Sequence, residues 1–193
     1  MKPWIKKRKP AHLTLFWSYI ALLLIAAFIF DTAIILFFYA IRNIILTAIM
    51  QVLTSIYIVL AVFAIAVILL WKTRQQWLLG ISALIALFIA IFLQYLIARP
   101  RPNIEHLATA GGASFPSMHA AFLFAMVPFL DKDLHKSKKI WLTLIILIAV
   151  SRLYLGVHYL SDIIFGAAIG YTIGYIFAWS QKKYSILEKL EIK

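Results

Sequence analysis

The sequence contains no cysteine, which excludes disulfide bonds and thiolate metal sites. Charged residues are also scarce, at 13% of the 193 residues, and only seven residues are acidic. Hydrophobic residues instead make up 64% of the chain, and the mean hydropathy is +0.95. A water-soluble globule cannot cover its surface with so few polar side chains. The composition therefore predicts an integral membrane protein.

The length of the chain and its apolar stretches predict an all-α, polytopic membrane protein. One membrane-spanning helix needs about 20 mostly apolar residues, so residues 1–193 hold about six transmembrane helices in a bundle and form a single domain. The expected spans are 15–30, 53–71, 77–97, 117–130, 140–150 and 163–179. The basic start resembles a signal peptide, but Asp31 stands where cleavage would need a small neutral residue. We therefore expect an uncleaved first helix.

Residues 31–51 are apolar but contain a polar stripe. Polar side chains recur there at every fourth position, at Tyr39, Asn43, Thr47 and Gln51. This spacing places them along one side of a helix, which indicates an amphipathic helix lying in the membrane interface. The alternative is a tilted span whose polar side packs against neighbouring helices.

Most basic residues mark one side of the cell membrane. The formal net charge is +12, and fifteen of the nineteen basic residues precede the first span, follow the last span or fall in alternate loops. Because they do not lie along one face of a soluble fold, we expect no nucleic-acid partner. By the positive-inside rule, these loops and both termini are cytoplasmic. The remaining four, on the opposite side, are Arg42, Arg99, Arg101 and Arg152.

Ionisable residues cluster on the extracytoplasmic side, where each one is costly at membrane depth and is usually paired and functional. His158 and Asp162 are four residues apart, which on a helix places them on one face. A carboxylate beside an imidazole fixes its tautomer and supports a developing positive charge, as a nucleophilic histidine requires. The pair alone fits equally well as a cap of the last helix.

Two arginines and the start of the fourth span add a possible phosphate site. Arg101 and Arg152 offer planar charged groups that match pairs of phosphate oxygens, although each alone could be a headgroup anchor. Pro116 and Ser117 open the fourth span, where free N–H groups and a hydroxyl can bind an anion. His119 could act there as a general acid. The alternative for this cluster is a helix cap with a histidine that faces water.

Together these residues resemble the three-part signature of the type 2 phosphatidic acid phosphatase family. The family pattern is Lys, six residues, Arg-Pro; then Pro-Ser-Gly-His; then Ser-Arg, five residues, His, three residues, Asp. Two positions depart from it, because Gln94 replaces the lysine and Met118 replaces the glycine. The positions that match are Arg101, Pro102, Pro116, Ser117, His119, Ser151, Arg152, His158 and Asp162.

The resemblance implies a mechanism and a set of roles. His158 would attack phosphorus to form a phosphohistidine, Asp162 would orient His158, and His119 would protonate the leaving lipid oxygen. No metal or other cofactor is implied. The phosphoryl oxygens would be held by Arg101, Arg152, Ser117 and Gln94.

We therefore expect an enzyme that dephosphorylates a lipid phosphate or diphosphate at the extracytoplasmic face. A polyprenyl diphosphate such as undecaprenyl diphosphate is the favoured substrate, because the small size and outward-facing site resemble bacterial members of that branch. Phosphatidic acid and phosphatidylglycerol phosphate come next. Two alternatives stay open: a lipid phosphotransferase, and a catalytically silent protein that binds lipid phosphate, which Gln94 suggests. Besides substrate and membrane lipids, the sequence indicates no partner and no oligomeric state.

Overall fold

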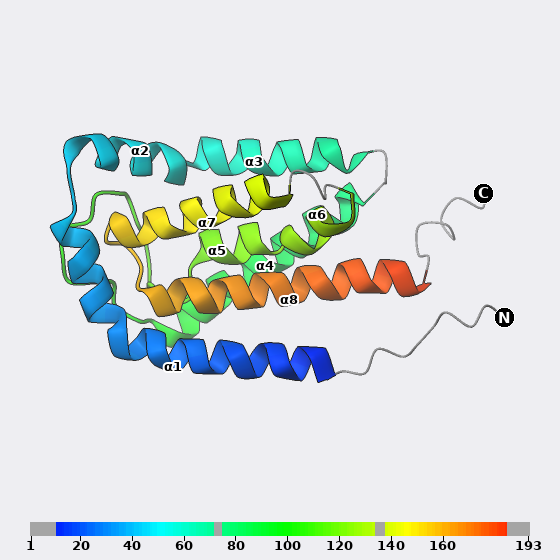
Figure 1. Ribbon diagram of the computed structural model, residues 1–193, viewed down its shortest axis with the longest axis horizontal. Helices are drawn as coiled ribbons and strands as arrows, with labels where there is room; N and C mark the ends of the chain where they lie inside the picture. Colours follow the sequence, from blue (N-terminus) through cyan, green and yellow to red (C-terminus); the bar gives the residue numbers. More distant parts are fainter. Residues whose placement is uncertain (1–10, 72–74, 134–137, 185–193) are drawn as a thin grey trace.

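The computed structural model describes residues 11–71, 75–133 and 138–184, and in these ranges it contains helices and no β-strand (Figure 1). The helices form an elongated bundle in which most axes run along its length. The predicted all-α fold is therefore confirmed. The helices are α1 (Ala11–Ala40), α2 (Ile44–Thr54), α3 (Ile56–Leu69), α4 (Gln76–Ile97), α5 (Met118–Phe124), α6 (Val127–Asp133), α7 (Lys138–Tyr154) and α8 (Leu160–Tyr184).

Three helices, α1, α4 and α8, are each long and apolar enough to cross a membrane. The α2–α3 pair also qualifies if the two helices, bent by 49° relative to each other, are taken as one span. The apolar stretch Met118–Leu130, which includes α5 and the start of α6, is shorter, and α7 has 17 residues. Length and composition thus support three or four spans among the described residues, and the expected six stays a prediction.

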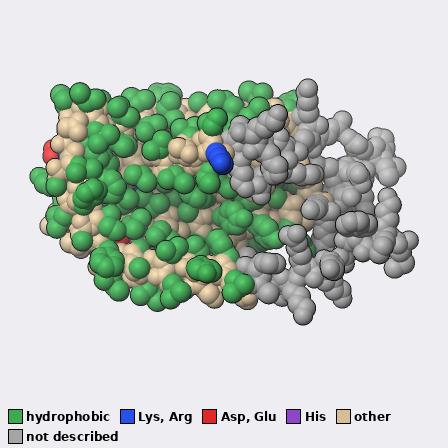
Figure 2. Space-filling model, viewed as in Figure 1, with side chains coloured by type: hydrophobic (Ala, Val, Ile, Leu, Met, Phe, Trp, Pro, Cys, Tyr) green, Lys and Arg blue, Asp and Glu red, His purple; other side chains and the backbone are tan. Residues whose placement is uncertain are grey.

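The outer surface of the bundle is strongly apolar. Large side chains such as Tyr95, Ile44 and Tyr57 are 88%, 86% and 80% exposed, and Figure 2 shows apolar side chains over most of the described part of one face. Exposed apolar area on this scale is unfavourable in water but suits a hydrocarbon environment. The chain is a membrane protein, as its composition predicts.

The first helix is longer than the sequence analysis predicted. α1 continues through Asp31 to Ala40, so the separate helix expected over 31–51 is wrong in its start. Neither proline nor glycine interrupts this stretch. The Asp31 carboxylate, which is 3% exposed, accepts hydrogen bonds from Ser161 and Arg99 and so needs no water.

The polar stripe of α2 faces the protein. The Thr47 hydroxyl lies 3.0 Å from the Tyr154 hydroxyl, and Gln51 Nε2 donates to the Leu107 carbonyl over 2.8 Å. The Asn43 side chain caps the helix. These contacts match the alternative in which the polar side packs against neighbours, while the depth of α2 in the membrane remains a prediction. Exposed residues on α2 include Ile44, Ile45, Ile49 and Val52.

The fourth expected span is divided into α5 and α6. α5 ends at Phe124 and α6 begins at Val127. Pro128 has no N–H to donate and is tolerated only in the first turn of a helix, which explains the interruption. α7 and α8 both extend beyond the ranges expected for the fifth and sixth spans.

Glycine allows α8 to pack very closely on α5. Gly166, Gly170 and Gly174 are four residues apart, and a Cβ at Gly170 would run into the carbonyl oxygen of Ala121. Small residues at this spacing let two membrane helices approach backbone to backbone. This close contact fixes the start of α5 against the start of α8.

Candidate active site

Two connections that are distant in sequence meet at one end of the bundle. The α4–α5 connection and the α7–α8 turn lie at the end opposite to the start of α1 and the end of α8 (Figure 1). The Leu107 N–H donates to the Leu155 carbonyl over 3.0 Å, and the Ser117 N–H donates to the Asp162 carbonyl over 3.0 Å. The polar segments that the sequence analysis assigned to one side are therefore together.

His158 lies in the turn before α8, which begins at Leu160, so the expected shared helix face with Asp162 is wrong. Its Nδ1 is nevertheless 2.7 Å from the Ser114 carbonyl oxygen and 3.4 Å from Asp162 Oδ2. A carbonyl oxygen can only accept, so Nδ1 carries the hydrogen and Nε2 keeps its lone pair. The side chain is 2% exposed.

Gly156 makes this turn possible. Its φ of +76° lies in the left-handed region, and a Cβ there would meet Arg42 Nη2 at 2.7 Å and Ile104 Cδ1 at 2.9 Å. Glycine alone suits both the backbone angle and the limited space. The chain can thus reverse between α7 and α8 and bring His158 back to Asp162.

The surroundings favour the neutral form of His158. Burial lowers its pKa, because an imidazolium ion would lose its water, and the charges of Arg152 and Arg101 lower it further. The hydrogen bond and charge of Asp162 act in the opposite direction without cancelling the effect of burial. The site therefore favours an uncharged His158 imidazole.

Arg101 is occupied by the loop that covers this end of the bundle. Its guanidinium donates to the carbonyl oxygens of Gly111, Gly112, Ala113 and Val157 at 2.8, 3.1, 3.0 and 2.5 Å. Burial lowers its pKa, although Asp162 opposes this effect. A phosphoryl group would have to replace some of these carbonyl oxygens.

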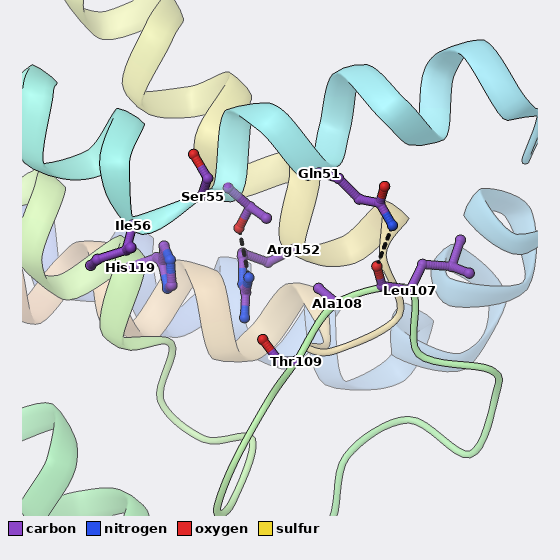
Figure 3. Close-up of a pocket in the computed structure, with 9 residues that line it drawn as sticks. Gln51, Ser55, Ile56, Leu107, Ala108, Thr109, His119 and Arg152 are labelled. Carbon is purple, nitrogen blue, oxygen red and sulfur yellow. Dashed lines mark hydrogen bonds between the residues drawn. The ribbon is translucent and has the colours of Figure 1, made fainter.

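A pocket of about 420 Å³ reaches Arg152 and His119, which lie beside each other in Figure 3. Arg152 Nη1 donates to the Thr54 hydroxyl over 2.6 Å, while its buried Nε has no hydrogen-bond partner among the described residues. An orphaned buried donor is costly, and an anion would satisfy it. The pocket is lined by Gln51, Thr54, Ser55, Ile56, Leu107, Ala108, Thr109, His119 and Arg152.

Ser117 and Gln94 lie nearby but are engaged by the backbone. Ser117 is the N-cap of α5, where its hydroxyl accepts from the Ala120 N–H, so Pro116 precedes the cap and does not begin the helix. Gln94 Nε2 donates to the Pro116 carbonyl over 2.8 Å. Both side chains support the segment that carries His119, and neither lines the pocket.

The surroundings of Asp162 were not predicted from the sequence. Arg99 Nη1 donates to Asp162 Oδ1 over 2.7 Å, and Arg99 Nη2 donates to Asp31 Oδ2 over 2.9 Å. The available signal was an aspartate inside an apolar span, which usually has a partner and a purpose.

The fourth arginine of this side, Arg42, serves the fold. It donates to the carbonyls of Glu105 and Tyr154 over 3.0 and 3.1 Å and so ties the α1–α2 corner to this end. Within the described ranges, no group of three or more His, Asp or Glu side chains is placed to hold a metal ion.

A model of one protein family matches residues 75–185, which include every residue of the signature. Its description is PAP2 superfamily. The chain belongs to the PAP2 superfamily. The resemblance stated from the motifs is thus confirmed.

Two curated relatives of this PAP2 protein are lipid phosphatases by name. The chain is 34% identical over 110 residues to decaprenylphosphoryl-5-phosphoribose phosphatase of Mycobacterium tuberculosis, covering 54% of this chain and 61% of that one. The match thus spans less than two thirds of the mycobacterial relative. The chain is 30% identical over 172 residues to lipid A 4'-phosphatase of Bacteroides thetaiotaomicron, covering 76% of this chain and 75% of that one.

A solved PAP2 structure has a similar fold. It is the transmembrane PAP2-type phosphatidylglycerolphosphate phosphatase from Bacillus subtilis, with a TM-score of 0.71 and 26% identity. The similarity covers 91% of this chain and 97% of that one.

Proposed function

We propose that this PAP2 protein is a lipid phosphate phosphatase that acts through a phosphohistidine on His158. The observation that carries the proposal is the pairing of Nδ1 with the Ser114 carbonyl and Asp162, which leaves the Nε2 lone pair for attack. The orphaned Nε of Arg152 supports an anionic ligand. The names of the relatives, which are lipid phosphatases, support the same reaction.

In the first step, His158 Nε2 attacks phosphorus. An N–P bond forms, the P–O bond to the lipid breaks, and the leaving oxygen takes a proton from the His119 imidazolium. Asp162 stabilises the positive charge that develops on His158. Arg101, Arg152, Ser117 and Gln94 are the proposed contacts of the phosphoryl oxygens.

In the second step, water attacks the phosphohistidine. His119, now neutral, accepts a proton from the water, the N–P bond breaks, and inorganic phosphate leaves. His158 and His119 return to their starting states. We propose that arginine charge, without a metal ion, stabilises both transition states.

The proposed substrate is a polyprenyl diphosphate such as undecaprenyl diphosphate, followed by phosphatidic acid or phosphatidylglycerol phosphate. The name of the mycobacterial relative, which contains a polyprenyl phosphate, favours this order. The proposed arrangement has six spans, cytoplasmic termini and an extracytoplasmic site.

The test is phosphate release by purified protein from a panel of lipid monophosphates and diphosphates, with and without a chelator. His158→Ala should lower the rate by about 10³-fold or more, because removal of a nucleophile disables the whole mechanism. His106→Ala is a matched control, since His106 is an exposed histidine of the α4–α5 connection outside the pocket and should keep its activity. Loss of activity in chelator would refute metal independence.

Trapping separates the remaining alternatives. Labelled substrate should leave an acid-labile, base-stable phosphate on the parent protein but not on the alanine variant. A labelled acceptor lipid would indicate a phosphotransferase. Full activity of His158→Ala would refute the mechanism, and no release from any lipid would favour the catalytically silent alternative.

A further inference from the structure

Arg99 joins two buried carboxylates that come from opposite ends of the sequence. Its Nη1 lies 2.7 Å from Asp162 Oδ1 at the start of α8, and its Nη2 lies 2.9 Å from Asp31 Oδ2 in α1. The two carboxylates are 0% and 4% exposed in their side chains. A guanidinium can satisfy both at once because its donors form a planar fork.

Ser161 closes the network. Its N–H donates to Asp31 Oδ1 over 3.0 Å, and its hydroxyl accepts from Arg99 over 2.6 Å while donating to Asp31 over 2.5 Å. Apart from its ion pair with Arg99, Asp31 therefore makes its contacts in this network with the residue beside Asp162.

Two aromatic rings restrict the position of Arg99. Its guanidinium carbon lies 4.1 Å from the centre of the Tyr159 ring and 5.0 Å from that of Phe28. The cation is thus held by aromatic faces as well as by carboxylates. Both terminal nitrogens of Arg99 already donate to carboxylates or to the Ser161 hydroxyl, so its contacts do not support a role in replacing the missing lysine at Gln94.

The two oxygens of Asp162 have separate partners. Oδ2 accepts from the Tyr159 N–H over 2.8 Å and lies beside His158 Nδ1, whereas Arg99 holds Oδ1. Among the described residues, no other hydrogen-bond partner of Oδ1 is present. Without Arg99, the carboxylate would be buried, partly unpaired and free to rotate away from His158.

We infer that Asp31 and Arg99 are positioning residues of the reaction: through Asp162, they hold the His158 ring in the orientation for attack. This inference rests on the proposed function for its kinetic consequences. Neither residue belongs to the three-part signature. Their role is to act on Asp162 and not to touch the substrate.

The kinetic test compares Arg99→Gln, Arg99→Lys, Asp31→Asn and the double variant Asp31→Asn/Arg99→Gln. We expect Arg99→Gln to lower kcat by about 10- to 100-fold, the range found for residues that orient metal-binding histidines, with KM nearly unchanged. Arg99→Lys should recover part of the loss because it keeps the charge. The double variant removes one charge of each sign, so it does not leave Asp31 as a second unpaired buried carboxylate.

The pH profile gives a readout that a purely structural role would not move. The charged or titratable groups that face His158 are Asp162, Arg101, Arg152 and His119. Loss of the Arg99 charge should move the acid limb to higher pH, because protonation of His158 becomes easier. Asp31→Asn should move it to lower pH, because the Arg99 charge is then less balanced.

Nitrogen-15 NMR of the histidines reports the tautomer of His158, and so tests without substrate whether its ring is held in place. The parent should show His158 as the Nδ1–H tautomer. Arg99→Gln should show a mixture, because a ring that Asp162 no longer holds can also leave the Ser114 carbonyl oxygen that fixes the tautomer. Arg42→Gln is the matched control, since Arg42 contacts carbonyl oxygens of the same end but no carboxylate.

The outcomes separate the two proposals. A parent protein that is inactive on every lipid refutes the proposed function, while the NMR result still tests the positioning role. An active parent whose Arg99 and Asp31 variants keep their kcat, acid limb and tautomer refutes the positioning role alone. A raised KM at unchanged kcat in Arg99→Gln would also refute it, because Arg99 would then contact the substrate.

Discussion

The charge state of His158 depends on three kinds of contact: burial, two arginines that disfavour protonation, and one carboxylate that favours it. The ring nitrogen towards Ser114 is a donor, so only the far nitrogen can bind a proton or a phosphoryl group. At the scale of single residues, the site thus keeps an imidazole neutral under conditions where a histidine in water would be partly charged.

This arrangement predicts the pH dependence of the reaction. Because the pKa of His158 is lowered, the nucleophile should stay neutral below about pH 6.5, the usual histidine value, and activity should fall only as the pH passes through the lowered value. The lowered pKa of His158 also affects the free energy of unfolding. Its contribution is fully present above the pKa that His158 has in the unfolded chain, and it is lost as the pH falls to the lower pKa of the folded protein. The measurement is kcat/KM against pH for the parent and Asp162→Asn.

The substrate ionises in the same way with both proteins, so a difference between the two pH profiles comes from the protein. Asp162→Asn should be much slower, and its acid limb should lie at lower pH, because Asp162 opposes the lowering of the His158 pKa. An acid limb that moves to higher pH in Asp162→Asn would contradict this account.

Local spacing predicted part of the site. The four-residue separation of His158 and Asp162 predicted their contact. The two residues do not share a helix as expected, but the turn at Gly156 brings His158 back to Asp162. The pairing of Asp31 with Arg99 joins residues 68 positions apart. No periodic pattern encodes such a pairing, so only the folded chain reveals it.

Among the helices, the contact of α8 with α5 sets the geometry beneath the site. Gly170→Ala should lower the free energy of unfolding by about 1–3 kcal/mol, the usual range for overpacking. The new methyl group would meet backbone atoms that cannot move aside. The measurement is thermal unfolding in detergent.

Gly80→Ala in α4 is the matched control. The nearest atom to its added Cβ is the tip of the Phe63 ring at 3.9 Å, so alanine should be tolerated. Equal losses of stability in both variants would show that close packing of α8 on α5 does not contribute more to stability than the packing around Gly80.

Helix boundaries were the least predictable level of the fold. The start of α4 is an exception: it was expected at Trp77 and lies at Gln76, because polar and charged residues precede the apolar stretch. α1 passed its expected end because Asp31 finds partners inside the bundle. Whether a helix continues through an aspartate such as Asp31 depends on the partners that the fold offers it, and a single sequence does not contain that information.

At the scale of the whole molecule, composition alone predicted the membrane class, while orientation stays a prediction. Many of the basic residues that support it, such as Lys2, Lys72 and Lys193, lie outside the described residues. The natural absence of cysteine allows a direct test with single-cysteine variants.

Asn103→Cys, in the exposed α4–α5 connection, should react with a membrane-impermeant maleimide in intact cells. Lys139→Cys, exposed near the start of α7, should react only after permeabilisation. The opposite labelling pattern would refute an extracytoplasmic site.

The loop carbonyls around Arg101 have a consequence for selectivity. They already satisfy the guanidinium, so an arriving anion gains only the difference between a charged acceptor and neutral ones. At Arg101, orthophosphate dissolved in water gains that difference alone. An amphiphile adds the affinity of its tail for the bilayer, about 0.8 kcal/mol per buried methylene, so the fold should prefer phosphates tethered to a membrane over the soluble cellular pool.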